Sequence, residues 1–110
     1  MQISIRRFDN AIVLDVSGDI DLSSSPEVRK ALLRELRDNR IPRVAVNLQQ
    51  VRYIDSSGVA SLVEGLKASR DSGARFILFG LGSIVREVLQ LSRLVRVFEI
   101  CDTEEQALGS

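Results

Sequence analysis

Four consecutive residues, Asp55-Ser56-Ser57-Gly58, have the types and the spacing to support chemistry. The surrounding pattern places the end of a strand before Asp55 and the start of a helix after it. A helix start carries free backbone N–H groups and the positive end of the helix dipole, so it stabilises an anion such as phosphate. The two serines predict a hydroxyl that can be phosphorylated and read by a partner. Because Asp and Ser are also preferred N-cap residues, the four residues alone are explained more simply by capping.

Composition limits the classes of function. The chain has 110 residues, of which 45% are hydrophobic, and this suits one domain spanning residues 1–110 with a real core. Lys and Arg together number 15, as do Asp and Glu, so the formal net charge is zero. There is no basic run, and the one Tyr and four Phe are spread along the chain. We therefore expect no binding to nucleic acid.

Catalysis has little support in the sequence. The chain has no histidine, which removes Ser-His-Asp and Cys-His catalysis and the common zinc sites. Gly80-Leu81-Gly82 lacks the further glycine of a dinucleotide fingerprint and the lysine of a Walker motif. Four carboxylates that could supply an acid pair lack an electrophilic partner; they are Asp15, Asp19, Asp21 and Asp55. We expect no catalytic residue, no cofactor and no metal, and hence a protein that is not an enzyme.

The single cysteine and the apolar pattern bear on location. Cys101 closes a buried strand pattern and cannot form an internal disulfide, which fits a reducing compartment. No apolar run approaches the roughly 18 residues that a membrane span needs, and the N-terminus does not resemble a signal peptide. The sequence therefore predicts a soluble cytoplasmic protein without membrane insertion.

Apolar periodicity predicts alternating strands and helices. Gln2 to Phe8 and Ala11 to Val16 read as an N-terminal β-hairpin, because a two-residue turn separates them. Three further strands are expected at Arg43 to Leu48, Arg75 to Phe79 and Arg96 to Ile100. Helices are expected from Pro26 to about Asn39, from Ser57 to Ser69, from Ile84 to Leu94 and from about Asp102 to Leu108. This order predicts an α/β fold, with a mostly parallel mixed sheet of about five strands and about four helices.

Small polar residues gather in the loops that follow the parallel strands. These loops are Gly18 to Ser25, Tyr53 to Gly58, and Gly80 to Ser83. In an open α/β sheet, ligands and partners meet the carboxyl ends of the strands, so this edge is the candidate functional surface. Short turns need the same residue types, and the composition of the loops alone does not decide between the two explanations.

At this point the chain resembles a known family, the STAS domains, and within it the bacterial anti-sigma factor antagonists. The likeness covers nearly the whole chain in the same order and spacing. It rests on Gly18-Asp19-Ile20-Asp21, Val46-Asn47-Leu48, Asp55-Ser56-Ser57-Gly58-Val59-Ala60 and Gly73-Ala74-Arg75. The resemblance implies the STAS fold for the single domain and favours phosphorylation over simple capping at the serine motif.

Members of this kind bind an anti-sigma factor that is also a serine kinase, and binding releases the sigma factor. The resemblance implies that the kinase phosphorylates Ser56, that the phosphorylated form no longer binds, and that a serine phosphatase restores it. Asp21 matches the acidic residue that the family has near the phosphorylation site. Asp55 and Ser57 flank the acceptor, and Gly58 begins the helix.

The predicted partner-binding surface combines the first two loops with the exposed side of the second helix. On that helix, Ser61 and Glu64 are expected to be exposed, because Val59, Leu62, Val63 and Leu66 mark the apolar side. The full set of predicted partner-binding residues is Asp19, Asp21, Ser23, Ser24, Asp55, Ser57, Gly58, Ser61 and Glu64.

Two other functions stay open within the same family. Some STAS domains are accessory subunits that bind the ATPase of lipid-handling ABC transporters, and several of these have lost the motif serine that this chain keeps. Others are scaffold subunits of stressosomes, many of which carry an additional N-terminal domain. The chemistry of the motif favours the antagonist, since Asp55-Ser56-Ser57-Gly58 is intact.

Overall fold

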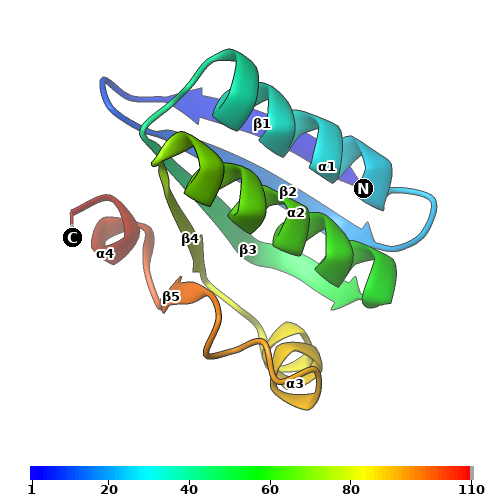
Figure 1. Ribbon diagram of the computed structural model, residues 1–110. Coiled ribbons are helices and arrows are strands. Elements are labelled where there is room, and N and C mark those ends of the chain that lie inside the picture. The colour runs from blue at the N-terminus through cyan, green and yellow to red at the C-terminus, as the bar shows by residue number, and fades with distance from the viewer. Residues whose placement is uncertain (110) are drawn as a thin grey trace.

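The alternating apolar pattern folds into a mixed sheet with helices on both faces. The computed structural model describes residues 1–109, and its five strands lie in the order β1-β2-β3-β4-β5 (Figure 1). The strands are β1 (Gln2–Arg7), β2 (Ile12–Ile20), β3 (Arg43–Ile54), β4 (Arg75–Phe79) and β5 (Glu99–Cys101). The helices are α1 (Ser25–Leu33), its π-helical continuation η1 (Arg34–Asp38), α2 (Ser56–Ser72), α3 (Ser83–Leu91) and α4 (Glu104–Gly109). The predicted fold class is confirmed.

The sheet is parallel except for its N-terminal hairpin. β1 pairs antiparallel with β2, with Ile3 opposite Val16 and Ile5 opposite Leu14. All other neighbouring pairs run parallel. Because β2, β3 and β4 point the same way, their carboxyl ends lie at one edge of the sheet, as the sequence predicts.

The two faces of the sheet are covered unequally. One face carries most of the core, formed by alternate residues of β2, β3 and β4 with α1, η1, α2 and α3. The opposite face has a small apolar cluster that α4 covers through Ala107; its strand members are Val13, Ala45, Ile77 and Phe79. Figure 1 shows α1 and α2 side by side over the first face. No helix within residues 1–109 has both the length and the apolar character to cross a membrane.

β3 is longer than predicted and reaches Ile54 instead of Leu48. The pairing of β2 with β3 shifts register twice, after Asp15 and after Gly18, so β3 fits in extra residues while staying paired. Asn47 supports the first irregularity, because its side-chain oxygen accepts a hydrogen bond of 3.0 Å from the Gln49 N–H. The sequence did not predict the longer strand, because the polar residues at 49 and 50 break the apolar pattern that is typical of a buried strand.

Two boundaries near the C-terminus also differ from the prediction. α3 ends at Leu91, three residues early, and β5 begins at Glu99 instead of Arg96. Between them the chain turns, and Arg93 takes a left-handed conformation with φ 58°. A left-handed residue stops a helix, and no glycine marks the position in the sequence.

Candidate functional site

The ends of β2 and β3 meet at the carboxyl edge of the sheet. The Asp55 N–H donates a hydrogen bond of 3.1 Å to the carbonyl oxygen of Ile20, which joins the turn after β3 to the end of β2. Asp19 lies opposite Tyr53 in the register of the two strands. The loop that follows β2 and the serine turn are therefore neighbours, as predicted, and α1 and α2 both begin at this edge (Figure 1).

Asp55 is the N-cap of α2. Its backbone is extended (φ −103°, ψ −174°), and its Oδ1 accepts a hydrogen bond of 3.1 Å from the Gly58 N–H. Ser56 is the first residue of the helix and is exposed, whereas Ser57 is half-buried. The N–H groups of this first turn have no acceptor inside the helix, so they can stabilise an anion carried by the Ser56 hydroxyl.

Asp21 closes the loop between β2 and α1. Its Oδ1 lies 3.1 Å from both the Ser23 and the Ser24 N–H groups and 2.7 Å from the Ser23 hydroxyl. Hydrogen bonds from the Ser23 and Ser24 side chains lower the pKa of the Asp21 carboxyl. Ser24 in turn accepts a hydrogen bond of 2.9 Å from the Asp21 N–H. Asp21 therefore orders this loop as well as placing a negative charge at the edge.

Gly58 lets α2 approach the end of β2 closely. A Cβ atom at this position would lie 2.6 Å from Cγ1 of Ile54 and 2.8 Å from both Cγ2 and the carbonyl oxygen of Ile20. Backbone atoms cannot move away as a flexible side chain can. Only glycine therefore fits where the helix start packs against the strand end, and Gly58 supports the site rather than touching a partner, because it is buried.

Replacing Gly58 with alanine should lower the free energy of unfolding by about 1–2 kcal/mol. Overpacking costs about 1–3 kcal/mol, and the better helix propensity of alanine returns up to about 1 kcal/mol. Urea denaturation of both proteins measures the difference. Gly82→Ala is the control, since a Cβ there would have no neighbour within 4 Å. Equal effects of the two changes would contradict the close packing at Gly58.

The prediction that Ser61 is exposed is wrong. Ser61 is 3% exposed, and its hydroxyl donates a hydrogen bond of 2.6 Å to the Gly58 carbonyl oxygen. The buried face of α2 includes Gly58, Ser61, Leu62 and Gly65. Compared with the predicted face, it is rotated toward the small residues, and Val63 is only half-buried. Glu64 is partly exposed, with 41% of its side chain accessible, and lies 3.9 Å from Arg29 of α1.

Two exposed apolar side chains at the edge were not predicted from the sequence. Leu22 is 75% exposed in the loop after β2, and Tyr53 is 48% exposed near the end of β3. Both flank the segments that the Asp55–Ile20 hydrogen bond brings together. Leu22 could have been recognised as a large apolar residue that directly precedes three serines in a predicted loop, where a short turn does not need one.

Three of the four carboxylates considered for acid–base chemistry are engaged by hydrogen bonds of their own. Asp15 accepts hydrogen bonds from Arg6, at 2.6 and 2.9 Å, and from Asn47 at 2.8 Å. These contacts lower the pKa of Asp15, and Arg6 is the main cause. Asp21 and Asp55 are engaged separately in their own turns. Within residues 1–109, no three His, Cys, Asp or Glu side chains are arranged to hold a metal ion.

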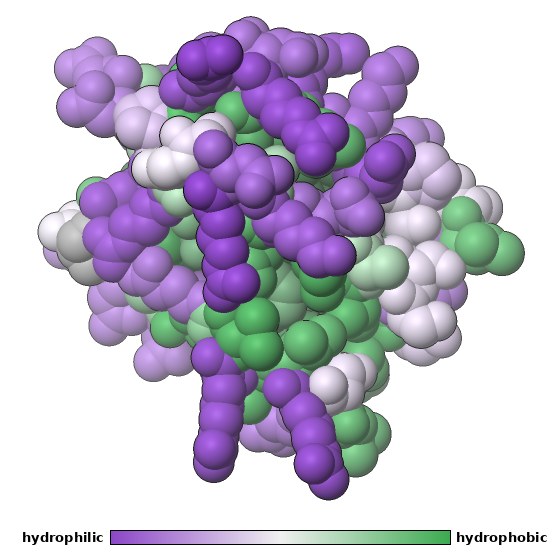
Figure 2. Space-filling model, viewed as in Figure 1, coloured by the Kyte–Doolittle hydropathy of each residue, from purple (hydrophilic) through white to green (hydrophobic). Residues whose placement is uncertain are grey.

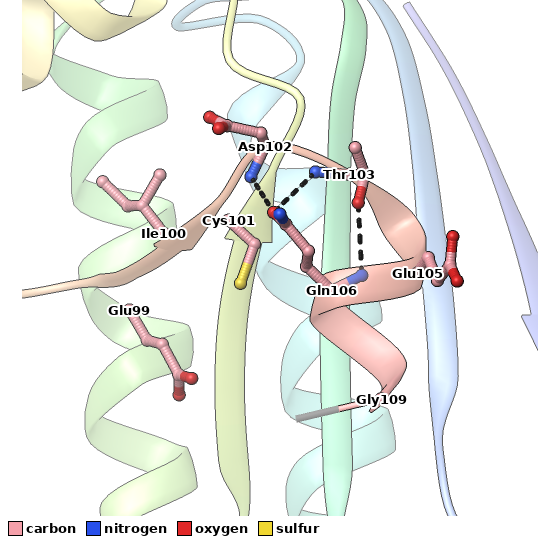
Figure 3. A pocket seen from close by; sticks show the side chains of 8 residues that line it. All are labelled: Glu99, Ile100, Cys101, Asp102, Thr103, Glu105, Gln106 and Gly109. Carbon is pink, nitrogen blue, oxygen red and sulfur yellow. Dashed lines mark hydrogen bonds between the residues drawn. The ribbon is translucent and has the colours of Figure 1, made fainter.

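A hollow of ≈ 870 Å³ lies elsewhere, between β5 and α4 (Figure 3). The Gln106 side-chain oxygen accepts hydrogen bonds of 3.0 and 3.4 Å from the N–H groups of Asp102 and Thr103, and these contacts fix the start of α4. Cys101 is the one thiol at this place, and the ionisable residues drawn around it are the carboxylates of Glu99, Asp102 and Glu105. The hollow is an open recess beside an edge strand, remote in sequence from the serine motif.

Known proteins resemble this chain in both sequence and fold. The family model described as STAS domain matches residues 2–107. An anti-sigma-B factor antagonist of Listeria monocytogenes is 29% identical over 114 residues, covering 100% of this chain and 98% of the relative. An anti-sigma-B factor antagonist of Bacillus subtilis is 28% identical over 100 residues, covering 91% of this chain and 82% of the relative.

Solved structures share the fold. SpoIIAA of Bacillus in its phosphorylated form superimposes with a TM-score of 0.76 at 20% identity, over 98% of this chain and 97% of that one. The five-stranded mixed sheet and its helices are thus a fold that this chain shares with SpoIIAA.

Proposed function

The chain belongs to the STAS domain family, and from this premise we propose that it is an anti-sigma factor antagonist switched by phosphorylation of Ser56. Curated relatives that align over the whole chain carry the name anti-sigma factor antagonist. In this proposal the protein binds an anti-sigma factor that is also a serine kinase, and so frees a sigma factor. It acts in the cytoplasm as a binding protein and a kinase substrate, not as an enzyme, and a serine phosphatase reverses the modification.

The observation that carries the proposal is the position of Ser56. It is exposed at the first turn of α2, beside the N-cap residue Asp55 and next to the loop that Asp21 orders. The exposed apolar side chains of Leu22 and Tyr53 border the same edge. A surface that combines apolar contacts with a modifiable hydroxyl suits a protein partner, because apolar burial supplies affinity and the hydroxyl supplies control.

Phosphorylation acts on the interface and leaves the fold intact. A phosphate adds roughly −1.5 to −2 charge, and the N–H groups of the first turn of α2 can stabilise it. In the complex, the same charge would have to be desolvated close to the carboxylates of Asp21 and Asp55. Since every 1.4 kcal/mol is a tenfold change in affinity, a few kcal/mol of repulsion and desolvation is enough to abolish binding.

Ser56→Ala should abolish phosphate incorporation by the cognate kinase, while Ser57→Ala should keep at least half of it. Ser56 is exposed, whereas Ser57 is half-buried one position further along the helix. Mass spectrometry after incubation with ATP and each kinase of the source genome measures the stoichiometry. Normal incorporation into the Ser56→Ala protein would contradict the assignment of the acceptor. If none of the kinases phosphorylates the wild-type protein, the chain is not a phosphorylated antagonist.

A further inference from the structure

The outward side of α1 and η1 is strongly basic. Five cations fall between residues 29 and 40: Arg29, Lys30, Arg34, Arg37 and Arg40, and all of them are exposed. The same stretch has two acidic residues, Glu35 and Asp38, and Glu35 is fully buried. The upper part of the face drawn in Figure 2, where α1 lies in Figure 1, is covered by hydrophilic side chains. A chain with no net charge therefore concentrates positive charge on one helix.

Most of these cations have no carboxylate to pair with. Among the residues that the structure describes, Lys30, Arg34, Arg37 and Arg40 make no salt bridge, and Arg29 is 3.9 Å from Glu64. Elsewhere, Arg6, Arg7 and Arg75 each form a close salt bridge with a carboxylate. Like charges at positions three and four apart on a helix repel one another. The arrangement costs stability in the free protein, and an anionic partner would remove that cost.

The basic side chains border a furrow along the helix. Its volume is ≈ 490 Å³, and four cations, Pro26, Leu33 and Asp38 line it. Leu33 is half-buried and gives the furrow an apolar contact between Lys30 and Arg37. The furrow therefore offers positive charge along its sides and one apolar contact within it. A ligand that fits this pattern has several negative charges and an apolar side chain between them.

We propose that the furrow on α1 and η1, defined by Lys30, Leu33, Arg34 and Arg37, binds an acidic polypeptide segment of a partner protein. A nucleic acid fits less well, because no aromatic side chain lines the furrow to stack on a base. A membrane surface fits less well, because Leu33 is half-buried and no large exposed apolar residue of α1 could insert into lipid. Because the net charge of the chain is zero, the surface outside the furrow is acidic overall. A peptide is narrow enough to contact the cations of the furrow without approaching that acidic surface.

This surface is distinct from the edge that carries Ser56. The furrow begins beside Pro26 in the first turn of α1 and runs away from the loop after β2. Arg34 and Arg37 belong to η1, at the far end of the helix from that loop. A partner bound there leaves Ser56 accessible. The inference therefore does not depend on the proposed function, and a change in the furrow should leave the phosphorylation of Ser56 at its wild-type stoichiometry.

The test uses a fluorescein-labelled 14-residue peptide of Glu, Leu and Ala, titrated with the protein and followed by fluorescence anisotropy. The variant Lys30→Glu/Arg34→Glu/Arg37→Glu should bind the peptide at least tenfold more weakly than the wild type. The matched control, Arg52→Glu/Arg93→Glu/Arg96→Glu, makes the same change in net charge at exposed positions outside the furrow, and should weaken binding less than threefold. Leu33→Ser should also weaken binding, which simple charge attraction would not require.

Three results would overturn the proposal. The first is no binding of the acidic peptide to the wild-type protein at low salt. The second is an equal loss of peptide affinity in the furrow variant and the control, which would mean that the affinity depends on net charge alone. The third is tighter binding of a 14-nucleotide single strand, or of phosphatidylglycerol vesicles, than of the peptide. Circular dichroism of each variant confirms that the fold is retained before its binding is compared.

Discussion

Replacing Arg7 with methionine is expected to lower the free energy of unfolding at pH 7 by clearly more than the ~0.5 kcal/mol of an ordinary surface change, because it removes the cation from a buried carboxylate. The side chain of Glu35, a residue of η1, is fully buried and depends on Arg7, whose guanidinium donates hydrogen bonds of 2.8 and 3.0 Å to its two oxygens. Asn39 adds a third hydrogen bond, of 3.1 Å. Methionine keeps the aliphatic length of Arg7 but leaves the buried carboxylate without its hydrogen-bonded cation. Urea denaturation measures the loss.

The pH dependence identifies the cause of that loss. Hydrogen bonds from Arg7, and then from Asn39, lower the pKa of Glu35 in the folded protein below its ordinary value. The stabilisation is therefore present above pH ~4.5 and is lost as the pH falls through the folded pKa. In Arg7→Met, burial without the Arg7 guanidinium should raise that pKa, so the variant should gain stability relative to wild type as the pH falls from 7 to 5.

Arg37→Met is the matched control for Arg7. Arg37 is an exposed cation of the same part of the fold that forms no salt bridge within residues 1–109, and its replacement should change the free energy of unfolding by less than about 0.5 kcal/mol. Losses of the same size in both variants would show that the buried pair has no special role.

Ser56→Asp should weaken the complex with the anti-sigma factor at least tenfold without unfolding the domain. Aspartate places one negative charge at the exposed first position of α2, where the helix dipole tolerates it. In the complex that charge must lose water close to Asp21 and Asp55. Isothermal titration calorimetry gives the affinity, and the true phosphate, with nearly two charges, should have the larger effect.

Ser72→Asp is the control for this change, since Ser72 is an exposed serine at the opposite end of α2. It should leave the affinity within twofold of the wild type. If Ser56→Asp also leaves the affinity unchanged, the serine turn lies outside the interface. That outcome would favour a partner of a different kind, such as the ATPase of a transporter.

The sequence was sufficient to predict the edge that carries Ser56, because local signals and general topology agree there. Asp55 is a strong N-cap, and one crossover helix between β2 and β3 makes the two strands parallel neighbours. The burial of Ser61 could not be predicted from such local signals. Gly58 and Gly65 pack tightly against Ile20, Leu32 and Phe76, and this rotates α2 toward its small residues. A pattern that counts only large apolar side chains misses that rotation.

The buried carboxylate of Glu35 lay beyond prediction for another reason. It stands in a helix among exposed arginines, and nothing local distinguishes it from a solvated residue. Its partner, Arg7, is 28 residues away in the chain and arrives there only when β1 pairs with β2. The length of β3 is a similar case, since its polar residues stay in the sheet only because the pairing with β2 shifts register.

The loop that Asp21 closes has a consequence for the speed and selectivity of recognition. Because one carboxyl oxygen accepts hydrogen bonds from the Ser23 and Ser24 N–H groups and from the Ser23 hydroxyl, these contacts restrain the loop in the free protein. Docking then costs little conformational entropy, and association needs no slow rearrangement. A partner binds tightly only if its surface is complementary to the shape that the loop already has. Any conformational adjustment on binding must therefore come from the partner.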